Sequence, residues 1–169
     1  ITANSQNLST INRFVPSIWN LIIHQKPSHI AVIFDPKGGT FRSELYEEYK
    51  AQRDAQPEDI TLALPYIIRI MEGMRIPVEI IPNFEADDVI GTLAKKAEKE
   101  GFQVFMVTPD KDYAQLVSEN IFQYKPARFG NDIEILGVED ILKKWEIKRI
   151  DQVIDILGLM GDSVDNIPG

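Results

Sequence analysis

The spacing of apolar residues along the chain predicts helices that alternate with buried strands. Apolar side chains recur at helical spacing over residues 11–24, and Pro27 follows as a helix breaker. Residues 29–34 are nearly all apolar, which is typical of a strand buried on both faces. The same reasoning predicts, in chain order, a polar helix, an apolar helix, a strand, an amphipathic helix and another buried strand over residues 41–53, 59–72, 78–81, 85–100 and 102–107.

The last third of the chain predicts smaller elements. A short helix is expected from Asp112, and residues 121–124 and 133–135 are expected to form a hairpin across Gly130-Asn131. Two more helices complete the pattern, over residues 138–145 and 150–160. Strands that are joined through helices by short turns favour an α/β fold, with three α/β/α layers around a mainly parallel central sheet.

Length and composition fit a single domain over residues 1–169, because a chain of this length with 44% hydrophobic residues can bury one core. No apolar run is long enough to span a bilayer, and the N-terminus lacks the pattern of a secretory signal, so we predict a cytoplasmic protein. The absence of cysteine and the presence of only two histidines argue against a zinc site built from these residues. Any metal ion is therefore expected to have oxygen ligands.

The net charge of -8 is unusual for a DNA-binding protein, because lysine and arginine supply most of the sequence-independent affinity for phosphates. Eight of the 26 acidic residues, however, lie in the motifs described next, and the other 18 balance the 18 lysines and arginines. The excess negative charge therefore equals the total charge of the eight carboxylates in the candidate metal site.

Two aspartates directly follow predicted buried strands. Asp35 comes after residues 29–34, and Asp110 comes after residues 102–107. The carboxyl ends of parallel strands meet at one edge of a sheet, where ligands gather. A single aspartate at such a position is also common in turns and helix caps, but two on parallel strands point to the same edge.

The segment Glu85-Ala86-Asp87-Asp88 places three acids at the start of a predicted helix. Acids in a first turn also stabilise a helix by interacting favourably with its dipole, which explains part of the pattern. At 3.6 residues per turn, however, Glu85 and Asp87 continue the apolar stripe of the helix and are expected to face the core. Because a buried carboxylate needs a partner or a metal ion, a ligand role is the favoured interpretation.

Two further pairs of acids complete the set. Asp110 and Asp112 lie at a strand end, and Asp162 and Asp165 follow a helix, where the pair alone would be typical of a capping turn. Carboxylates that converge without metal repel one another, whereas hard divalent cations turn the repulsion into ligation. We therefore predict Mg²⁺ or Mn²⁺, as two ions about 4 Å apart. The predicted ligands and catalytic residues are Asp35, Glu85, Asp87, Asp88, Asp110, Asp112, Asp162 and Asp165.

Four segments of the chain resemble successive motifs of one nuclease family. FDPKGGTFRSELYEEYKAQR, FEADDVIGTLAKKAEKEG, TPDKDYAQLVS and LGLMGDSVDNIPG are similar to the 5′-3′ exonuclease domain of bacterial DNA polymerase I, in the flap-endonuclease superfamily with its PIN-like, resolvase-like fold. The resemblance implies two-metal hydrolysis of DNA during primer removal and repair. It implies Asp35, Glu85, Asp87 and Asp88 for one ion and Asp110, Asp112, Asp162 and Asp165 for the other. The implied partners are DNA with 5′ ends, flaps or nicks and a polymerase domain of the same parent chain, and the implied state is a monomer.

The predicted helix over residues 41–53 carries Arg42, Tyr46, Lys50 and Arg53 at steps of four, four and three. By composition alone this pattern fits an ordinary solvated helix with paired charges. The resemblance instead implies a helical gateway that grips the 5′ strand through phosphate contacts, with aromatic residues stacking on an unpaired base.

The family pattern extends beyond both ends of this sequence. It opens with a strand that ends in another metal-binding aspartate, and it continues past the final Ile-Pro-Gly into a helix-hairpin-helix element. We therefore expect a single catalytic domain that lacks these two parts, folds, and cleaves weakly. Three alternatives remain: a PIN-type ribonuclease, a phospho-acceptor receiver domain, and a module that binds branched DNA without cutting it.

Overall fold

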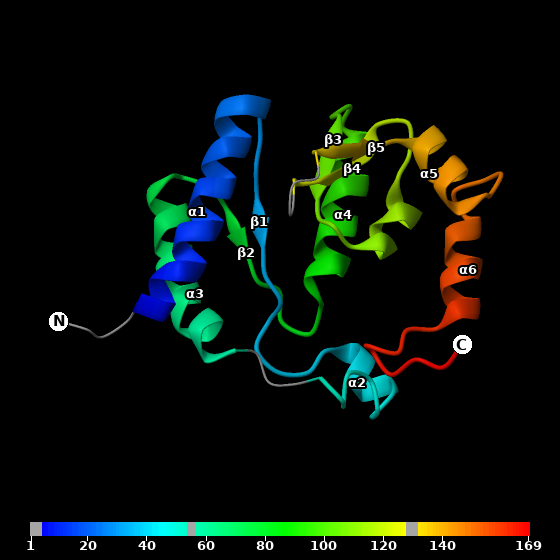
Figure 1. Cartoon of the computed structure of the whole chain (residues 1–169), viewed down its shortest axis with the longest axis horizontal. Coiled ribbons are helices and arrows are strands. Elements are labelled where there is room, and N and C mark those ends of the chain that lie inside the picture. Colours follow the sequence, from blue (N-terminus) through cyan, green and yellow to red (C-terminus); the bar gives the residue numbers. More distant parts are fainter. Residues whose placement is uncertain (1–4, 54–56, 128–131) are drawn as a thin grey trace. The chain divides into compact units, whose positions relative to one another are not determined.

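The computed structural model describes residues 5–53, 57–127 and 132–169. The chain divides into two compact units, and Figure 1 labels their elements. The first unit comprises Ile1–Asp35 and Arg53–Ile80, and the second comprises Pro36–Gln52 and Ile81–Gly169. Within the described ranges, none of the helices combines the length and the apolar character that a membrane span requires.

The first unit packs two helices beside a pair of parallel strands (Figure 1). Helix α1 is Ser5–Gln25, strand β1 is Val32–Ile33, helix α3 is Glu58–Gly73 and strand β2 is Val78–Glu79. β1 and β2 pair in parallel, with Val32 opposite Val78. Both strands are shorter than predicted, but each lies inside its predicted range. The core of this unit consists of Val32, Ala63, Ile67, Met71 and Ile76.

The second unit contains the remaining elements. In chain order they are α2 Phe41–Leu45, α4 Ala86–Lys99, β3 Val104–Val107, the 3-10 helix η1 Lys111–Leu116, β4 Ile121–Lys125, β5 Glu134–Leu136, α5 Val138–Trp145 and α6 Gln152–Met160. The strand order is β3-β4-β5; β3 is parallel to β4, and β5 is antiparallel to β4. The predicted hairpin is therefore confirmed, although its predicted turn at residues 130–131 lies outside the described residues.

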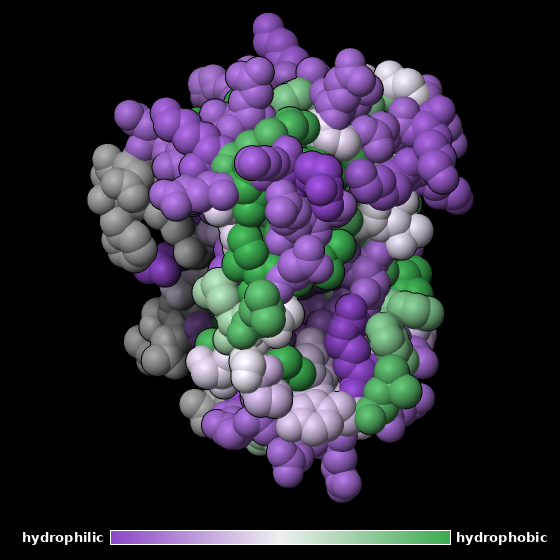
Figure 2. Space-filling view, turned by 90° about the vertical axis from the view of Figure 1, so that its right-hand side faces the viewer, coloured by the Kyte–Doolittle hydropathy of each residue, from purple (hydrophilic) through white to green (hydrophobic). Residues whose placement is uncertain are grey.

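Apolar side chains from α4, the sheet, η1, α5 and α6 form the core of the second unit. It includes Ile121 of β4, which is 0% exposed, and Val153 of α6. Burial of one such side chain contributes about 1.5 to 3 kcal/mol. α6 also exposes apolar residues, among them Leu159 and Met160, and Figure 2 shows apolar residues among the hydrophilic ones on the face that it views. The core fixes the strand ends that carry the candidate site.

The prediction of one continuous helix over residues 41–53 is wrong. Helix α2 ends at Leu45, and Tyr46 adopts an extended conformation. Lys50 has a positive φ of 57°, and its backbone N–H donates to the carbonyl oxygen of Asp165 at 3.1 Å. The side chain of Asn166 donates to the carbonyl oxygen of Glu48 at 3.0 Å. Hydrogen bonds to the loop after α6 thus replace the helical ones that the local pattern favours.

Candidate metal centre

The loop after β3 presents Asp110 and Asp112. Asp110 caps η1, and its Oδ1 accepts a hydrogen bond from the backbone N–H of Asp112 at 3.0 Å. The side chain of Gln123, which is 1% exposed, donates to the carbonyl oxygens of Thr108, at 3.2 Å, and Asp110. A buried amide from β4 therefore holds this loop at the carboxyl end of the sheet, as expected for a ligand-binding edge.

Asp112 has an unsatisfied carboxylate oxygen. Its Oδ1 is buried and has no hydrogen-bond partner among the described residues. Burial raises the pKa of Asp112 first, and the negative charge of Asp110 raises it further. Asp162 and Asp87 add to the increase, whereas Lys111 acts in the opposite direction. A buried carboxylate with a free oxygen and acidic neighbours favours a bound cation.

Asp87 lies in the first turn of α4 and is exposed, so the prediction that it faces the core is wrong. The packed part of the helix begins near Ile90, and the first turn extends beyond it. Oδ1 of Asp87 accepts a hydrogen bond of 2.6 Å from the hydroxyl group of Tyr113, which is 3% exposed. The prediction for Glu85 is confirmed, because that residue is 9% exposed. Tyr113 thus holds Asp87 beside η1.

Glu85 and Asp88 are held by two cations. Arg42 donates from Nη1 and Nη2 to the two carboxylate oxygens of Asp88, at 2.6 and 2.7 Å. Lys50 Nζ lies 2.7 Å from Oε1 of Glu85. The backbone N–H of Glu85 also donates to Asp88 at 3.0 Å, which completes a capping box at the start of α4.

These ion pairs shift the pKa values of Arg42, Asp88 and Lys50. The hydrogen bond from Arg42 is the largest cause that lowers the pKa of Asp88 below its usual value. The same bond raises the pKa of Arg42. For Lys50, burial lowers the pKa, but the hydrogen bond to Glu85 and other contacts outweigh it and raise the pKa overall. Asp88, Arg42 and Lys50 are therefore charged at neutral pH.

Asp165 lies beside Glu85. Nζ of Lys50 is 3.8 Å from Oδ2 of Asp165, and the hydroxyl group of Tyr49 donates to Glu85 at 3.1 Å and to Asp165 at 3.3 Å. Burial is the first cause that raises the pKa of Tyr49 to about 12, so this hydroxyl group remains a donor at neutral pH. Tyr49 and Lys50 together hold Asp165, in the loop after α6, next to Glu85 at the start of α4.

Asp162 organises the loop after α6. Its Oδ1 accepts hydrogen bonds from the backbone N–H groups of Val164, at 2.8 Å, and Asp165, at 3.2 Å. Its backbone pairs with Ile167 in an isolated antiparallel bridge. These contacts are typical of a capping turn, and its charge also acts on Asp112.

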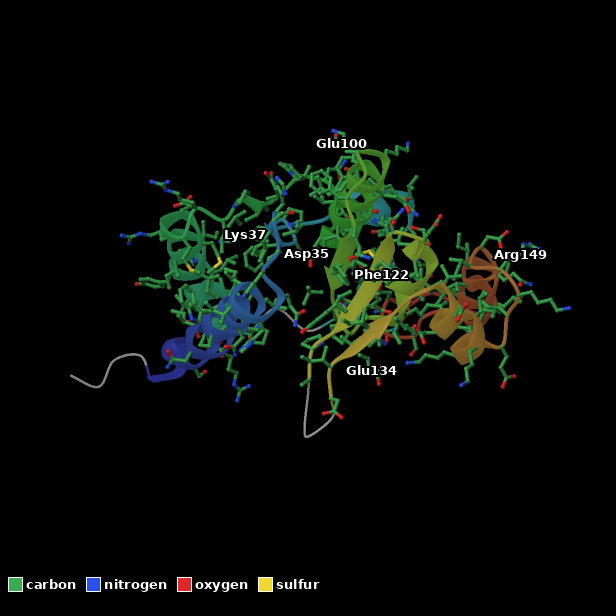
Figure 3. The ribbon with its side chains drawn as sticks, turned by 90° about the horizontal axis from the view of Figure 1, so that it is seen from above. Asp35, Lys37, Glu100, Phe122, Glu134 and Arg149 are labelled. Atoms are coloured by element: carbon green, nitrogen blue, oxygen red, sulfur yellow. The ribbon has the colours of Figure 1, made fainter. Side chains whose placement is uncertain are left out.

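The seven candidate ligands that belong to the second unit form two groups. The first, which we call the η1 group, shares electrostatic interactions centred on Asp112 and consists of Asp87, Asp110, Asp112 and Asp162. The second, which we call the α2 group, shares Arg42, Lys50 and Tyr49 as partners and consists of Glu85, Asp88 and Asp165. Asp35 belongs to the first unit, where it is exposed and lies two residues after the end of β1 (Figure 3).

The chemistry of these residues fits a hard divalent cation. Their side chains offer only carboxylate oxygens, which Mg²⁺ prefers, and the buried Oδ1 of Asp112 has no hydrogen-bond partner among the described residues. Among residues 5–53, 57–127 and 132–169, no three acidic or histidine side chains stand close enough to hold an ion as they are arranged. Glu85 and Asp88 are drawn instead to Lys50 and Arg42, so ligation requires these side chains to exchange partners.

The residues predicted to bind DNA differ in their surroundings. Arg42 and Lys50 contact the α2 group, as described above. Tyr46 is 38% exposed, and its hydroxyl group donates to Glu48 at 3.2 Å. Arg53 is exposed and belongs to the first unit. The four side chains therefore do not share one helical face.

Three residues that contact the acids were missing from the prediction. Tyr49 and Tyr113 donate to carboxylates, and Gln123 supports the Asp110 loop. For Gln123 the sequence contains a signal, because a glutamine in the middle of the apolar strand Ile121–Lys125 must find a buried partner. No comparable signal in the sequence indicates that Tyr49 and Tyr113 contact the acids.

Comparison with known proteins identifies the family. Residues 1–146 match the family described as 5′-3′ exonuclease, N-terminal resolvase-like domain. The chain belongs to this family. The resemblance noted from the sequence motifs is thereby confirmed.

Sequence relatives agree with this assignment. The chain is 38% identical over 161 residues to a 5′-3′ exonuclease of Aquifex aeolicus (strain VF5), covering 95% of this chain and 54% of the relative. It is 36% identical over 156 residues to DNA polymerase I of Bacillus caldotenax, covering 92% of this chain and 18% of the relative. It thus spans about half of the first relative and less than a fifth of the second.

The fold is shared with structures of a phage nuclease. The T5 D15 protein co-crystallised with metal ions matches 94% of this chain and 62% of its own, with a TM-score of 0.76 and 23% identity. The T5 5′-exonuclease with bound zinc matches 94% of this chain and 60% of its own, with a TM-score of 0.74 and 23% identity. The predicted α/β class with a PIN-like, resolvase-like fold is confirmed.

Proposed function

We propose that this chain is a metal-dependent 5′-3′ exonuclease and 5′ flap endonuclease that hydrolyses phosphodiester bonds of DNA. The observation that carries the proposal is the unsatisfied, buried oxygen of Asp112 among acidic neighbours, at the sheet edge of a chain from a 5′-3′ exonuclease family. A carboxylate in these surroundings is costly without a cation, which supports a metal site.

Eight carboxylates are proposed as ligands of two Mg²⁺ or Mn²⁺ ions. In the proposed split, Asp35, Glu85, Asp87 and Asp88 serve one ion, and Asp110, Asp112, Asp162 and Asp165 serve the other. When bound, the ions supply activation of a water molecule and neutralisation of the negative charge that develops on the phosphate. Tyr113 keeps Asp87 directed toward η1, and Gln123 keeps the Asp110 loop in place.

Arg42 and Lys50 have two successive roles in this proposal. In the metal-free protein they neutralise Asp88 and Glu85. When Asp88 and Glu85 exchange these partners for metal ions, the guanidinium and ammonium groups become available to DNA phosphates, together with Arg53. Tyr46, which is 38% exposed, is proposed to stack on an unpaired base. Cations at the entrance also offset the repulsion between DNA and the acids.

The proposed substrates are DNA molecules with 5′ ends, flaps or nicks. Relatives of this chain include proteins named DNA polymerase I, which supports a role in primer removal and repair and a polymerase domain in the same parent chain. We propose residues 1–169 as one catalytic domain that acts as a monomer. A role in replication would place it in the cytoplasm.

Cleavage of a 5′-flap DNA tests the proposal. The full chain is incubated with a labelled flap in Mg²⁺, in Ca²⁺ and in EDTA, and we expect products only in Mg²⁺. Asp110→Asn is expected to abolish the products, whereas Asp132→Asn, at an exposed acid outside both groups, is expected to leave them unchanged. Flap binding in Ca²⁺ without any cleavage in Mg²⁺ or Mn²⁺ would favour a non-cleaving DNA-binding module. Cleavage of an RNA of the same sequence, without cleavage of the DNA, would favour a PIN-type ribonuclease.

A further inference from the structure

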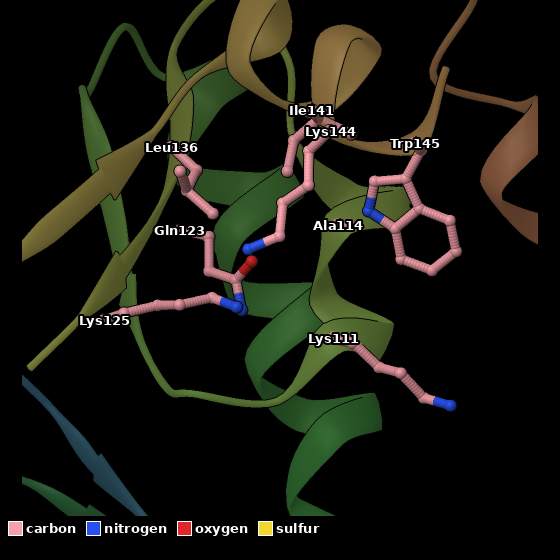
Figure 4. Close-up of a pocket in the computed structure, with 8 residues that line it drawn as sticks. All are labelled: Lys111, Ala114, Gln123, Lys125, Leu136, Ile141, Lys144 and Trp145. Atoms are coloured by element: carbon pink, nitrogen blue, oxygen red, sulfur yellow. The ribbon is translucent and has the colours of Figure 1, made fainter. Parts of the chain in front are cut away.

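A small pocket lies between β4, β5, η1 and α5, behind the Asp110 loop. Its volume is about 170 Å³, and its polar lining consists of Lys111, Lys125, Lys144, Gln123 and the indole of Trp145. Figure 4 shows the ammonium groups of Lys125 and Lys144 on either side of the Gln123 amide, whereas Lys111 points away. Two cations therefore converge in a chain whose net charge is -8.

Lys125 and Lys144 repel each other across the pocket. Burial is the first cause that lowers the pKa of Lys125, and the charge of Lys144 lowers it further. Glu134, opposite Lys125 in the β4–β5 pair, and Asp110 act in the opposite direction without restoring the usual pKa. An anion between the two ammonium groups would remove this repulsion.

The size of the pocket limits what it can hold. Pockets for drug-sized ligands have volumes of roughly 300 to 1,000 Å³, and this pocket is well below that range. A nucleoside is therefore too large, whereas a tetrahedral oxyanion is a group of the right size. The lining offers lysine ammonium groups, which bind phosphate as point charges, and the nitrogen of Trp145 is turned toward the pocket (Figure 4).

We propose that this pocket binds a phosphate group, with Lys125 and Lys144 as its charged ligands. Lys125 ends β4, and Asp110 follows β3, so the pocket lies on the same sheet edge as the η1 group, one strand away. Gln123 links the two, because its amide lines the pocket and donates to the carbonyl oxygen of Asp110. The phosphate is either free phosphate or part of a DNA strand. The pocket depends on no metal ion, so its occupancy does not require nuclease activity.

Fluorescence of Trp145 provides the test. The chain has two tryptophans, and the variant Trp19→Phe leaves Trp145 as the single reporter. In EDTA and at constant ionic strength, we titrate this protein with inorganic phosphate, with chloride, and with a short DNA strand bearing either a 5′ phosphate or a 5′ hydroxyl group. We expect a saturable change with phosphate and none with chloride. A response to both strands assigns the site to the phosphates of the DNA backbone. A response to the 5′-phosphorylated strand alone assigns it to a terminal phosphate. A response to neither strand assigns it to free phosphate.

Charge-removing variants identify the ligands. Lys125→Gln and Lys144→Gln are each expected to weaken phosphate binding at least about tenfold, because a charge-assisted contact is lost. The matched control is Lys143→Gln, at the neighbour of Lys144 on α5. Both lysines are exposed, but Lys143 does not line the pocket, so this variant is expected to bind phosphate as the parent does. Thermal unfolding of each variant verifies that the fold is intact. Absence of a saturable phosphate response, or equal losses in the Lys143 and Lys144 variants, would overturn the proposal.

Discussion

Replacement of Asp112 by asparagine is expected to change stability in opposite directions without and with metal. Without metal, the carboxylate has a buried oxygen that lacks a partner among the described residues, and its pKa is raised first by burial and then by Asp110. The Asp112→Asn substitution keeps the shape of the side chain and removes its charge. The metal-free variant should therefore be more stable than the parent, whereas the metal-loaded variant should have lost a ligand.

The size of each effect follows from the contacts. A buried polar atom without a partner costs about 1 to 3 kcal/mol, and the amide relieves part of that cost, so we expect a gain of about 1 kcal/mol. For a domain of this length, 1 kcal/mol raises Tm by roughly 2 to 4 °C. Saturation of the parent with an ion at about 100 times its Kd adds about 2.7 kcal/mol. The Asp112→Asn variant should obtain at most half of that stabilisation from the ion.

Thermal unfolding in EDTA and in Mg²⁺ measures both effects, with Asp132→Asn as the control. The sign of the pH dependence is a further check. Because the folded pKa of Asp112 is raised, its charge destabilises the metal-free fold as pH rises from the usual aspartate pKa through the raised one. The advantage of the variant should therefore be present at neutral pH and vanish in acid. A variant that is less stable than the parent in EDTA, or that gains as much from Mg²⁺, would refute the reasoning.

Four further substitutions test the contacts around the acids and the core. Arg42→Met and Asp88→Asn should each lower the free energy of unfolding by about 1 to 2 kcal/mol in EDTA, and the double variant by little more, because they share one ion pair. Since the pKa of Asp88 is lowered, this stabilisation should be present above the usual aspartate pKa and disappear as pH falls through the lowered one. Tyr113→Phe should cost about 1 kcal/mol by removing the hydrogen bond to Asp87. Ile121→Ala, at a 0% exposed position, should cost about 2 to 5 kcal/mol.

Urea unfolding measures all of these changes. Additive effects of Arg42→Met and Asp88→Asn would show that the two side chains act independently. A Tyr113→Phe variant as stable as the parent would show that the hydroxyl group gains nothing from Asp87.

The sequence predicted α3, α4 and the strand ends well, because their signals are local, whereas α1 begins six residues before its predicted start at residue 11. The apolar stripe of α4 and its first-turn acids locate the helix to within a residue of Ala86–Lys99. The strand that leads into Asp110 is confirmed as β3, at the same edge as the end of β4. Local periodicity is sufficient for these elements, since each of them buries one continuous face.

Other features depend on contacts between distant residues, which one sequence does not reveal. The end of α2 at Leu45 depends on the hydrogen bond from Lys50 to Asp165, 115 positions further along the chain. The pairing of Arg42 with Asp88 likewise joins residues 46 positions apart, and it engages a side chain that the family resemblance assigns to DNA. Helical spacing placed Asp87 on the apolar stripe of α4, but it did not show that the packed part of the helix begins only near Ile90, so the predicted burial of Asp87 is wrong.

The location of Mn²⁺ ions in a crystal of the full chain tests the central claim most directly. Mn²⁺ scatters anomalously, so its positions are measured independently of the protein density. We expect ions bound by the η1 group, with Asp112 as a direct ligand, and displacement of Lys50 from Glu85. Well-ordered acids with no anomalous peak among them, and with Lys50 and Arg42 still bound to Glu85 and Asp88 at saturating Mn²⁺, would contradict the account.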